Sequence, residues 1–324
     1  MHGLTILTPV FNDWESLGGM LGELDRALDR DALTAEVLVV DDGSTVPLRS
    51  ELADRHFTRI SRVEVLHLRR NLGHQRAIAI GLAFIYGERP CEAVVVMDAD
   101  GQDRPSDVPT LVRRFQEEGG RRIVFASRAR RSESLFFKIC YHGYRAVHKV
   151  LTGVSVRVGN FSILPFGALG SLVAVSELWN HYSAAVFKAK LPYATVPTHR
   201  ASRIAGDPRM NFFTLVLHGM SALSVFGDVI GVRLLVAASA LLALVSGGFG
   251  VTFLGQFRAG APGPGVALFL LGILLILTVQ LVAMACALIF GVLGGRANLT
   301  FLPIRDYRHF VRDVSKTFES ARVN

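Results

Sequence analysis

Acidic and amide side chains cluster in one short segment of the chain, directly after an apolar run. Asp98, Asp100, Gln102 and Asp103 fall within a stretch of six residues. Carboxylate and amide oxygens are the ligands that Mg²⁺ and Mn²⁺ prefer, and such a site leaves coordination positions for phosphate oxygens. The segment therefore offers three oxygen donors, from Asp98, Asp100 and Gln102, to a divalent cation. Taken alone, an Asp-x-Asp pair is more often a solvated loop, so its surroundings decide.

Three further polar segments follow apolar runs in the same way. They are Pro9–Asp13, Asp41–Ser44 and Asn71–Ala77. Each has an ordinary explanation by itself, because Asp-Asp-Gly-Ser forms a good turn and an Asn or Asp can begin a helix. Four such segments in succession, each at the end of an apolar run, instead indicate one common ligand site.

Short runs rich in β-branched residues alternate with helical patterns in the N-terminal part of the chain. This alternation predicts a doubly wound, mostly parallel α/β sheet, in which ligands bind beyond the carboxyl ends of the strands. The predicted strands are Leu4–Val10, Glu36–Val40, Val63–Leu68, Ala93–Met97 and Arg122–Ala126. The predicted helices are Glu15–Leu28, Gly73–Tyr86, Pro105–Glu118 and Ser134–Leu151. The polar segments then meet at one edge of the sheet.

The C-terminal third of the 324 residues carries an apolar excess. Half of all residues are apolar, and the mean hydropathy of +0.37 is high for a soluble globular protein. Residues 234–254 and 266–291 are uncharged, and each run exceeds the length of about 20 residues that crosses a bilayer as a helix. A breaker-rich turn, Gln256–Gly265, separates them. Buried core helices of this length normally keep a polar stripe, so the pattern predicts a transmembrane hairpin.

Basic residues border this hairpin and predict its orientation. The chain has 35 Lys and Arg against 27 Asp and Glu, a net charge of +8. The connecting turn contains only Arg258, whereas five arginines lie outside the other ends, namely Arg233, Arg296, Arg305, Arg308 and Arg312. The positive-inside rule then assigns both termini to the cytoplasm. No nucleic-acid recognition motif accompanies this charge, so nucleic acid is not an expected partner.

Taken together, the four polar segments resemble the inverting family-2 glycosyltransferases, over about residues 3–210. The resemblance rests on Pro9–Asp13, Val40–Ser44, Asn71–Gly73 with Ala77 and Gly81, and Asp98–Asp103. Within that family the chain is most similar to the polyprenyl-phosphate glycosyltransferases, which include dolichyl-phosphate mannose synthase and bacterial undecaprenyl-phosphate sugar transferases. The features of this group are Gln102, Ala126–Arg128, Arg203–Arg209 and the two C-terminal membrane helices. The resemblance implies a nucleotide-binding, glycosyltransferase A-type fold.

The resemblance also implies a nucleotide-sugar donor, UDP- or GDP-linked, and a pocket for it. Pro9, Phe11 and Asp13 would line the nucleotide pocket. Asp41 and Asp42 would complete it, with Asp42 contacting the base. Phe11 and Asp13 stand where tyrosine and glutamate are more common, and these exchanges keep the stacking ring and the charge.

The metal and phosphate contacts follow from the same resemblance. Asp98 would contact the ribose or the metal, while Asp100 and Gln102 would bind Mg²⁺ or Mn²⁺. Phosphate groups, including that of the lipid, would be bound by Arg128, Arg203 and Arg209, with Lys138 as a weaker candidate. Asp100 and Arg128 are the expected catalytic residues, because a metal and an arginine can stabilise the charge on a leaving diphosphate.

The expected acceptor is a polyprenyl monophosphate such as undecaprenyl phosphate. The second pKa of a phosphate monoester is about 6, so the acceptor is already an anionic nucleophile at neutral pH. Asn160 stands where many relatives carry an aspartate that has been considered a base, and an amide cannot act as one. A phosphate acceptor tolerates this exchange, whereas a lipid alcohol would need a base. His74 is interpreted as a surface or pocket-wall residue.

Two other functions stay open. One is transfer to a different lipid or glycan acceptor, although the Gln-x-x-Arg-Trp of processive synthases does not occur in the chain. The other is a non-catalytic membrane scaffold, which the intact Asp98, Asp100 and Gln102 oppose.

We expect this chain to be a multi-pass protein of the inner (plasma) membrane. Residues 1–204 would be a cytoplasmic catalytic domain, 205–228 a juxtamembrane amphipathic helix, 229–295 two transmembrane helices at about 230–254 and 266–291, and 296–324 a cytoplasmic tail. Met210–Phe226 is short for a span and is expected to lie on the membrane, with entry into it as the alternative. The glycines of 247–250 permit close helix packing, and so a homo-oligomer, without requiring it.

Overall fold

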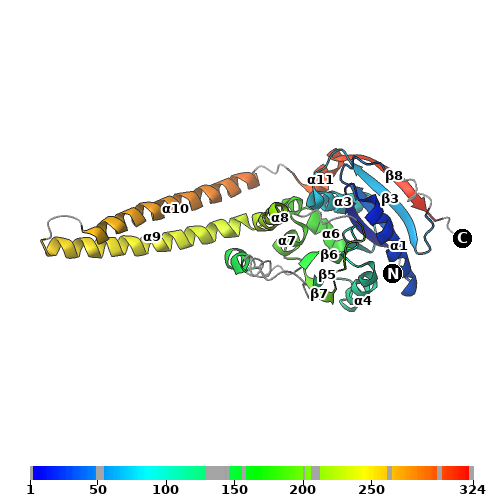
Figure 1. Cartoon of the computed structure of the whole chain (residues 1–324), viewed down its shortest axis with the longest axis horizontal. Helices are drawn as coiled ribbons and strands as arrows, with labels where there is room; N and C mark the ends of the chain where they lie inside the picture. Colours follow the sequence, from blue (N-terminus) through cyan, green and yellow to red (C-terminus); the bar gives the residue numbers. More distant parts are fainter. Residues whose placement is uncertain are drawn as a thin grey trace. The chain divides into compact units, whose positions relative to one another are not determined.

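The computed structural model describes residues 3–48, 55–128, 143, 146–154, 158–199, 201–205, 212–260, 265–297 and 301–320. The chain divides into two compact units. The first unit is made of Met1–Ile139, Val156–Val225 and Thr300–Asn324, and the second of Cys140–Ser155 and Phe226–Leu299. The sheet belongs to the first unit and the two long apolar helices belong to the second (Figure 1).

The first unit is built on one eight-stranded sheet in the order β7-β5-β6-β4-β1-β2-β3-β8. β1 is parallel to β2 and β4, β2 is parallel to β3, and β5 is parallel to β7, whereas β6 and β8 run antiparallel to their neighbours. The strands are β1 (Leu4–Val10), β2 (Ala35–Asp41), β3 (Ile60–Leu68), β4 (Ala93–Val96), β5 (Ile123–Arg128), β6 (Val158–Pro165), β7 (Tyr193–Thr198) and β8 (Val311–Glu319). The predicted doubly wound, mostly parallel sheet is confirmed.

Helices cover both faces of the sheet, so its central strands are buried on both sides. All seven residues of β1 are buried, as expected for a strand between two helical layers. One core contains α1 (Trp14–Arg30) and α4 (Val108–Glu117). The opposite core contains α3 (His74–Glu88), α6 (Phe166–Val173) and α7 (Tyr182–Lys188). The shorter elements are η1 (Pro105–Asp107), η2 (Ser176–Trp179), α11 (Pro303–Asp306) and η3 (Tyr307–His309).

The close contact between α3 and the sheet depends on a glycine. A Cβ at Gly81 would lie 2.5 Å from the Leu7 side chain and 2.7 Å from that of Val40. Both neighbours are fully buried, so they have no free space into which to move. Gly81 therefore fixes how closely α3 approaches the strands whose ends carry the polar segments.

The five predicted strands are present, and their ends differ from the predicted ones by at most three residues. β6, β7 and β8 have no counterpart among the predicted elements. β8 lies within 296–324, which the sequence led us to expect as a tail, and it forms the edge of the sheet beside β3. Most of the predicted helix Ser134–Leu151 lies outside the described residues, and its described residues, 143 and 146–151, are helical.

The second unit contains a hairpin of two helices, α9 (Gly227–Arg258) and α10 (Val266–Ala297). They pack side by side, and a Cβ at Gly231 near the start of α9 would lie 2.7 Å from Ile289 near the end of α10. At the turn, the Gly265 amide donates to Gln256 Oε1 over 3.2 Å. Both helices are long and apolar enough to cross a membrane, and most of their side chains are exposed, for example Leu244 (73%).

α8 (Phe212–Ser224) lies within the predicted juxtamembrane helix and belongs to the first unit. Leu217 and Met220 are exposed by 68% and 57%, whereas Ala222 is buried. One side of this helix therefore presents large apolar side chains to the outside of its unit.

Candidate active site

The predicted site lies at the carboxyl edge of the four parallel strands β1 to β4. Val10 is the register partner of Asp41, and Leu7 is the partner of Val96. The segments that follow these strands therefore start side by side. The parallel register explains why four segments from distant parts of the sequence meet at one edge of the sheet.

The loops after β1 and β2 are joined by hydrogen bonds around Asn12. The Asn12 amide donates to Ser44 Oγ over 2.9 Å, and its side-chain Oδ1 accepts from the amides of Thr45 and Val46 over 2.9 and 3.0 Å. Asn12 has a φ of 50°, a left-handed conformation that asparagine tolerates better than most residues. Phe11 beside it is 37% exposed.

Asp42 joins the loop after β2 to the loop before α3. Its two carboxylate oxygens accept the amides of Leu72 and Gly73 over 2.7 and 2.8 Å. Burial raises the pKa of Asp42, and these two hydrogen bonds only partly oppose that rise. Asp42 was expected to contact the base, and the structure gives it a role in holding the loop.

Asp41 is also held by its surroundings. Its Oδ1 accepts the Ser44 amide over 2.9 Å, and its Oδ2 lies 2.8 Å from His67 Nδ1. Burial alone would raise the pKa of Asp41, but the hydrogen bonds from His67 and Ser44 outweigh it and lower the pKa. Asp41 is therefore an ionised acceptor beneath the loop after β2.

The acidic segment after β4 forms a tight turn. The Asp98 amide donates to Asp103 Oδ2 over 3.1 Å, and the Gln102 amide donates to Asp100 Oδ1 over 2.9 Å. Gly101 has a φ of +79°, and a Cβ there would overlap the side chain of Ile204. The turn thus depends on glycine for both its backbone and its packing.

The donors of this turn are all oxygens. Among the described residues, no group of three His, Cys, Asp or Glu side chains is arranged to hold a metal ion. The predicted set from Asp98, Asp100 and Gln102 contains only two carboxylates, with an amide as the third donor. Oxygen donors of this kind are the ones that a hard cation such as Mg²⁺ or Mn²⁺ prefers, and the assignment of these three residues to a metal stays a prediction.

Arg203 brings the predicted nucleotide, metal and phosphate residues together. Its guanidinium forms an ion pair with Asp13, and its Nη1 lies 3.3 Å from Asp100 Oδ2. The three side chains are between 14% and 20% exposed. The guanidinium expected to bind the substrate phosphates therefore lies between a residue of the predicted nucleotide pocket and a predicted metal ligand.

The backbone around Arg203 is hydrogen-bonded to the turn formed by residues 98–103. The Ala201 amide donates to the Gln102 carbonyl over 3.1 Å, and the Ile204 amide donates to the Asp100 carbonyl over 3.0 Å. Ile204 also packs against Gly19 of α1, where a Cβ would lie 2.8 Å away. Segment 201–205 is therefore held in place by the ion pairs of Arg203, by two backbone hydrogen bonds and by the packing of Ile204.

His74 is a site residue to which the sequence assigned no chemical role. Its Nε2 lies 3.1 Å from Asp98 Oδ1 and 3.0 Å from the side-chain Nδ2 of Asn160 on β6. Burial would lower the pKa of His74, but the charges of Asp98, Asp103 and Asp100 outweigh it and raise the pKa. His74 directly follows the Asn71–Gly73 segment at the start of α3. This position is the feature of the sequence that could have identified it as a site residue.

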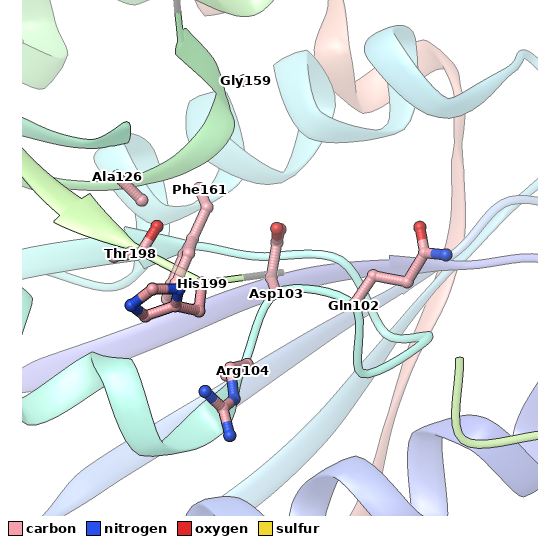
Figure 2. Close-up of a pocket in the computed structure, with 8 residues that line it drawn as sticks. All are labelled: Gln102, Asp103, Arg104, Ala126, Gly159, Phe161, Thr198 and His199. Atoms are coloured by element: carbon pink, nitrogen blue, oxygen red, sulfur yellow. The ribbon is translucent and has the colours of Figure 1, made fainter. Parts of the chain in front are cut away.

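A pocket lies next to the turn formed by residues 98–103, at the ends of β5, β6 and β7. Figure 2 shows Gln102 and Asp103 extending from the turn, with Thr198 and His199 next to Phe161 on the side of Asp103 away from Gln102. The residues that line this pocket are Gln102, Asp103, Arg104, Ala126, Gly159, Phe161, Thr198 and His199. Polar side chains from separate elements thus surround a space next to the predicted metal ligands.

The remaining predicted residues are only partly described. Pro9 lies within β1, in register with Val40. Arg128 ends β5, in register with Thr198 of the pocket, which brings its backbone to the same edge. Lys138 and Arg209 lie outside the described residues.

The model of glycosyl transferase family 2 matches residues 5–172, which is more than half of the chain. The protein belongs to this family of glycosyltransferases.

Individual relatives narrow the resemblance. Undecaprenyl-phosphate 4-deoxy-4-formamido-L-arabinose transferase of Enterobacter sp. is 25% identical over 248 residues, covering 72% of this chain and 73% of that protein. The same transferase of Erwinia tasmaniensis is 31% identical over 150 residues, 46% of this chain and 44% of that protein. The glycosyltransferase YkcC of Bacillus subtilis is 25% identical, with 68% coverage of both. The expected resemblance to polyprenyl-phosphate sugar transferases is confirmed.

Solved structures show the same fold. Mannosyl-3-phosphoglycerate synthase from Rubrobacter xylanophilus matches with a TM-score of 0.50 and 16% identity, covering 69% of this chain and 72% of that one. Glucosyl-3-phosphoglycerate synthase from Mycobacterium tuberculosis, in complex with Mn²⁺, UDP-glucose and phosphoglyceric acid, matches with a TM-score of 0.51 and 13% identity, covering 71% and 80%. The glycosyltransferase A-type fold expected from the sequence is confirmed.

Proposed function

We propose that this glycosyltransferase transfers a sugar from a UDP- or GDP-linked donor to a polyprenyl phosphate, such as undecaprenyl phosphate, at the cytoplasmic side of the plasma membrane. The observation that carries the proposal is the contact of Arg203 with both Asp13 and Asp100. It gathers a nucleotide-pocket carboxylate, a candidate metal ligand and a phosphate-binding cation at one strand edge. The similarity to undecaprenyl-phosphate sugar transferases supports the acceptor class.

The reaction is a single displacement with inversion at the anomeric carbon. A phosphate oxygen of the lipid attacks that carbon, and the bond from the carbon to the diphosphate oxygen breaks. The electron pair of this bond leaves with the nucleoside diphosphate. No proton has to be removed, because the acceptor is ionised above its second pKa of about 6. Asn160 at the expected base position is compatible with such an acceptor.

We assign each of the candidate site residues a part in this reaction. Asp98, Asp100 and Gln102 would bind Mg²⁺ or Mn²⁺, which stabilises negative charge on the leaving diphosphate. Arg203 would exchange its carboxylate partners for phosphate oxygens, which a guanidinium binds through paired hydrogen bonds. Phe11 would stack on the base, and Arg128 would support the phosphates from the end of β5.

The membrane part of the proposal rests on α9 and α10. Their exposed apolar side chains would be covered by lipid, as in a two-helix anchor. The exposed Leu217 and Met220 of α8 fit a helix that lies on the membrane surface. A lipid-linked phosphate could then approach the enzyme without leaving the bilayer.

The test is a donor panel with the purified full-length protein in lipid nanodiscs. UDP- and GDP-sugars are each incubated with undecaprenyl phosphate and Mg²⁺ or Mn²⁺. We expect one donor class to give a lipid product that resists phosphatase and is cleaved by mild acid. Transfer to a lipid alcohol but not to the phosphate would contradict the acceptor class. Absence of transfer from every donor would favour a scaffold.

A further inference from the structure

The segment that follows the membrane hairpin returns to the sheet and forms its edge strand beside β3. β8 pairs with β3 in the register Val65 to Ser315 and His67 to Asp313. Just beyond this ladder, the Arg69 amide donates to the Phe310 carbonyl over 2.9 Å. β8 therefore borders the point at which β3 ends and the loop toward α3 begins.

A hydrogen-bonded chain leads from β8 into the nucleotide side of the site. Ser315 Oγ lies 2.8 Å from His67 Nε2, and His67 Nδ1 lies 2.8 Å from Asp41 Oδ2. An ionised carboxylate can only accept, so the proton between His67 and Asp41 is on Nδ1. Nε2 on the other side of the ring shares a hydrogen bond with the Ser315 hydroxyl. Both nitrogens of this imidazole are thereby occupied.

The chain continues from Asp41 to the loop after β1. Asp41 Oδ1 accepts the Ser44 amide over 2.9 Å, and Ser44 Oγ accepts the Asn12 amide over 2.9 Å. Asn12 has the left-handed φ of 50°, so its conformation needs support from its neighbours. Four hydrogen bonds thus connect a strand that follows the membrane hairpin to both loops of the predicted nucleotide pocket.

We propose that Ser315 and His67 are positioning residues for the donor nucleotide, acting through Asp41 on loop 41–46 and on Asn12. The inference rests on the proposed function, because it concerns the same nucleotide pocket. His67 and Asp41 have side chains only 14% and 8% exposed, so they shape the pocket from beneath. The part of the chain beyond the membrane hairpin then belongs to the donor site.

The expected defect follows from which bonds are lost. Without the Ser315 hydroxyl, the imidazole loses one of its two anchors and its orientation toward Asp41 is less fixed. Asp41 then holds Ser44, and Ser44 holds Asn12, less firmly. The loss affects donor binding, whereas the reacting atoms keep their own contacts. The donor KM should therefore change more than kcat.

The experiment compares Ser315→Ala, Ser315→Thr and Thr317→Ala in the full-length protein in nanodiscs. Ser315→Thr keeps the hydroxyl, and Thr317→Ala removes a hydroxyl from the same strand at a residue for which the described structure gives no side-chain hydrogen bond. Amide hydrogen exchange of peptides covering 41–46 is measured without nucleotide. UDP and GDP binding is measured by calorimetry, and KM and kcat are measured with the active donor.

Ser315→Ala should speed exchange in 41–46 and raise the nucleotide Kd and donor KM by about three- to tenfold, the range for one lost hydrogen bond. kcat should stay within about twofold, and Ser315→Thr should restore the wild-type values. Unchanged exchange of the β3 and β8 amides would show that the strand is intact. Ser315→Ala behaving like Thr317→Ala would overturn the inference.

Failure of the proposed function would look different. If the wild-type protein binds no nucleotide, the donor assignment fails. The exchange comparison would still decide whether Ser315 orders loop 41–46, because it needs no ligand. If the wild-type protein binds nucleotide and Ser315→Ala binds it equally well with unchanged exchange, only the positioning role fails.

Discussion

Arg203 forms an ion pair with Asp100 across 103 positions of sequence, with Arg203 Nη1 3.3 Å from Asp100 Oδ2. Asp100 is a candidate ligand of a divalent cation, so a side-chain cation already lies against one of its oxygens. The same guanidinium also contacts Asp13. A metal ion would compete with Arg203 for the Asp100 carboxylate, and substrate phosphates would compete with Asp13 and Asp100 for the guanidinium.

Removal of the guanidinium should therefore have two opposite effects. In Arg203→Gln, Mn²⁺ should bind roughly three- to tenfold more tightly without nucleotide, because a competing and partly screened charge is lost. The donor KM should rise by roughly tenfold or more, because a phosphate ligand is lost. Paramagnetic resonance of Mn²⁺ and donor kinetics measure the two effects.

Arg113→Gln is the matched control for this variant. Arg113 pairs with Asp31 over 3.4 Å on the exterior of the first unit, and its side chain is 65% exposed. That variant should leave both quantities unchanged. If Arg203→Gln gave the same values as Arg113→Gln, Arg203 would have no part in cation or phosphate binding.

Asp100 itself should be required for transfer. Asp100→Asn keeps the shape of the side chain but removes its charge, so kcat should fall by roughly 10²–10³-fold. Chelation of divalent ions should cause a comparable loss in the wild-type protein, reversed by Mg²⁺ or Mn²⁺. Asp31→Asn is the control for a carboxylate outside the site. Full activity of Asp100→Asn in chelator would mean that no metal is used.

The sequence was sufficient to predict the strand edge. Each of β1 to β4 is a short buried run, and the polar residues directly after them converge because parallel strands end at a common edge. Asp13 and Asp100 were accordingly predicted in one site. The membrane-length helices were predictable for a similar reason, since the absence of charge over such lengths is a local property.

Contacts over long sequence distances could not be predicted in this way. β8 has the sequence VRDVSKTFE, in which polar residues outnumber apolar ones, and only its pairing with β3 makes it a strand. The bond between Ser315 and His67 joins residues 248 positions apart. Asp42 has an equally hidden role, because its partners Leu72 and Gly73 belong to another loop.

Gly43 should be essential for joining the nucleotide loops. It has a φ of +70°, and a Cβ there would lie 2.5 Å from the Arg70 carbonyl carbon. Gly43→Ala should therefore lower Tm and reduce the free energy of unfolding by about 2–4 kcal/mol, from backbone strain plus a backbone clash. Nucleotide affinity should fall with it, because the loops after β2 and β3 would separate.

Gly119 provides the matched control for that prediction. Its φ is +69°, almost the same, but no atom lies within 4 Å of the Cβ that a substitution would add. Gly119→Ala should cost only the strain of a left-handed backbone, about 1 kcal/mol. Thermal unfolding of both variants separates the clash from the strain. Equal losses would mean that the contact between Gly43 and Arg70 contributes nothing.

Asn160 tests whether the reaction needs a base. Its side chain lies between Gln75, whose Nε2 is 3.3 Å from Asn160 Oδ1, and His74, whose Nε2 is 3.0 Å from Asn160 Nδ2. If the acceptor is a phosphate that is ionised above a pKa of about 6, a carboxylate at this position has no proton to remove. Asn160→Asp should therefore leave kcat within about threefold of wild type at pH 7–9, whereas a limiting base would add about 10²–10⁴-fold.

Steady-state transfer to undecaprenyl phosphate across this pH range measures the effect, with Asn160→Ala reporting the loss of packing alone. A gain of a hundredfold in Asn160→Asp would mean that deprotonation of the acceptor limits the wild-type enzyme, and would point to a hydroxyl rather than a phosphate as the nucleophile.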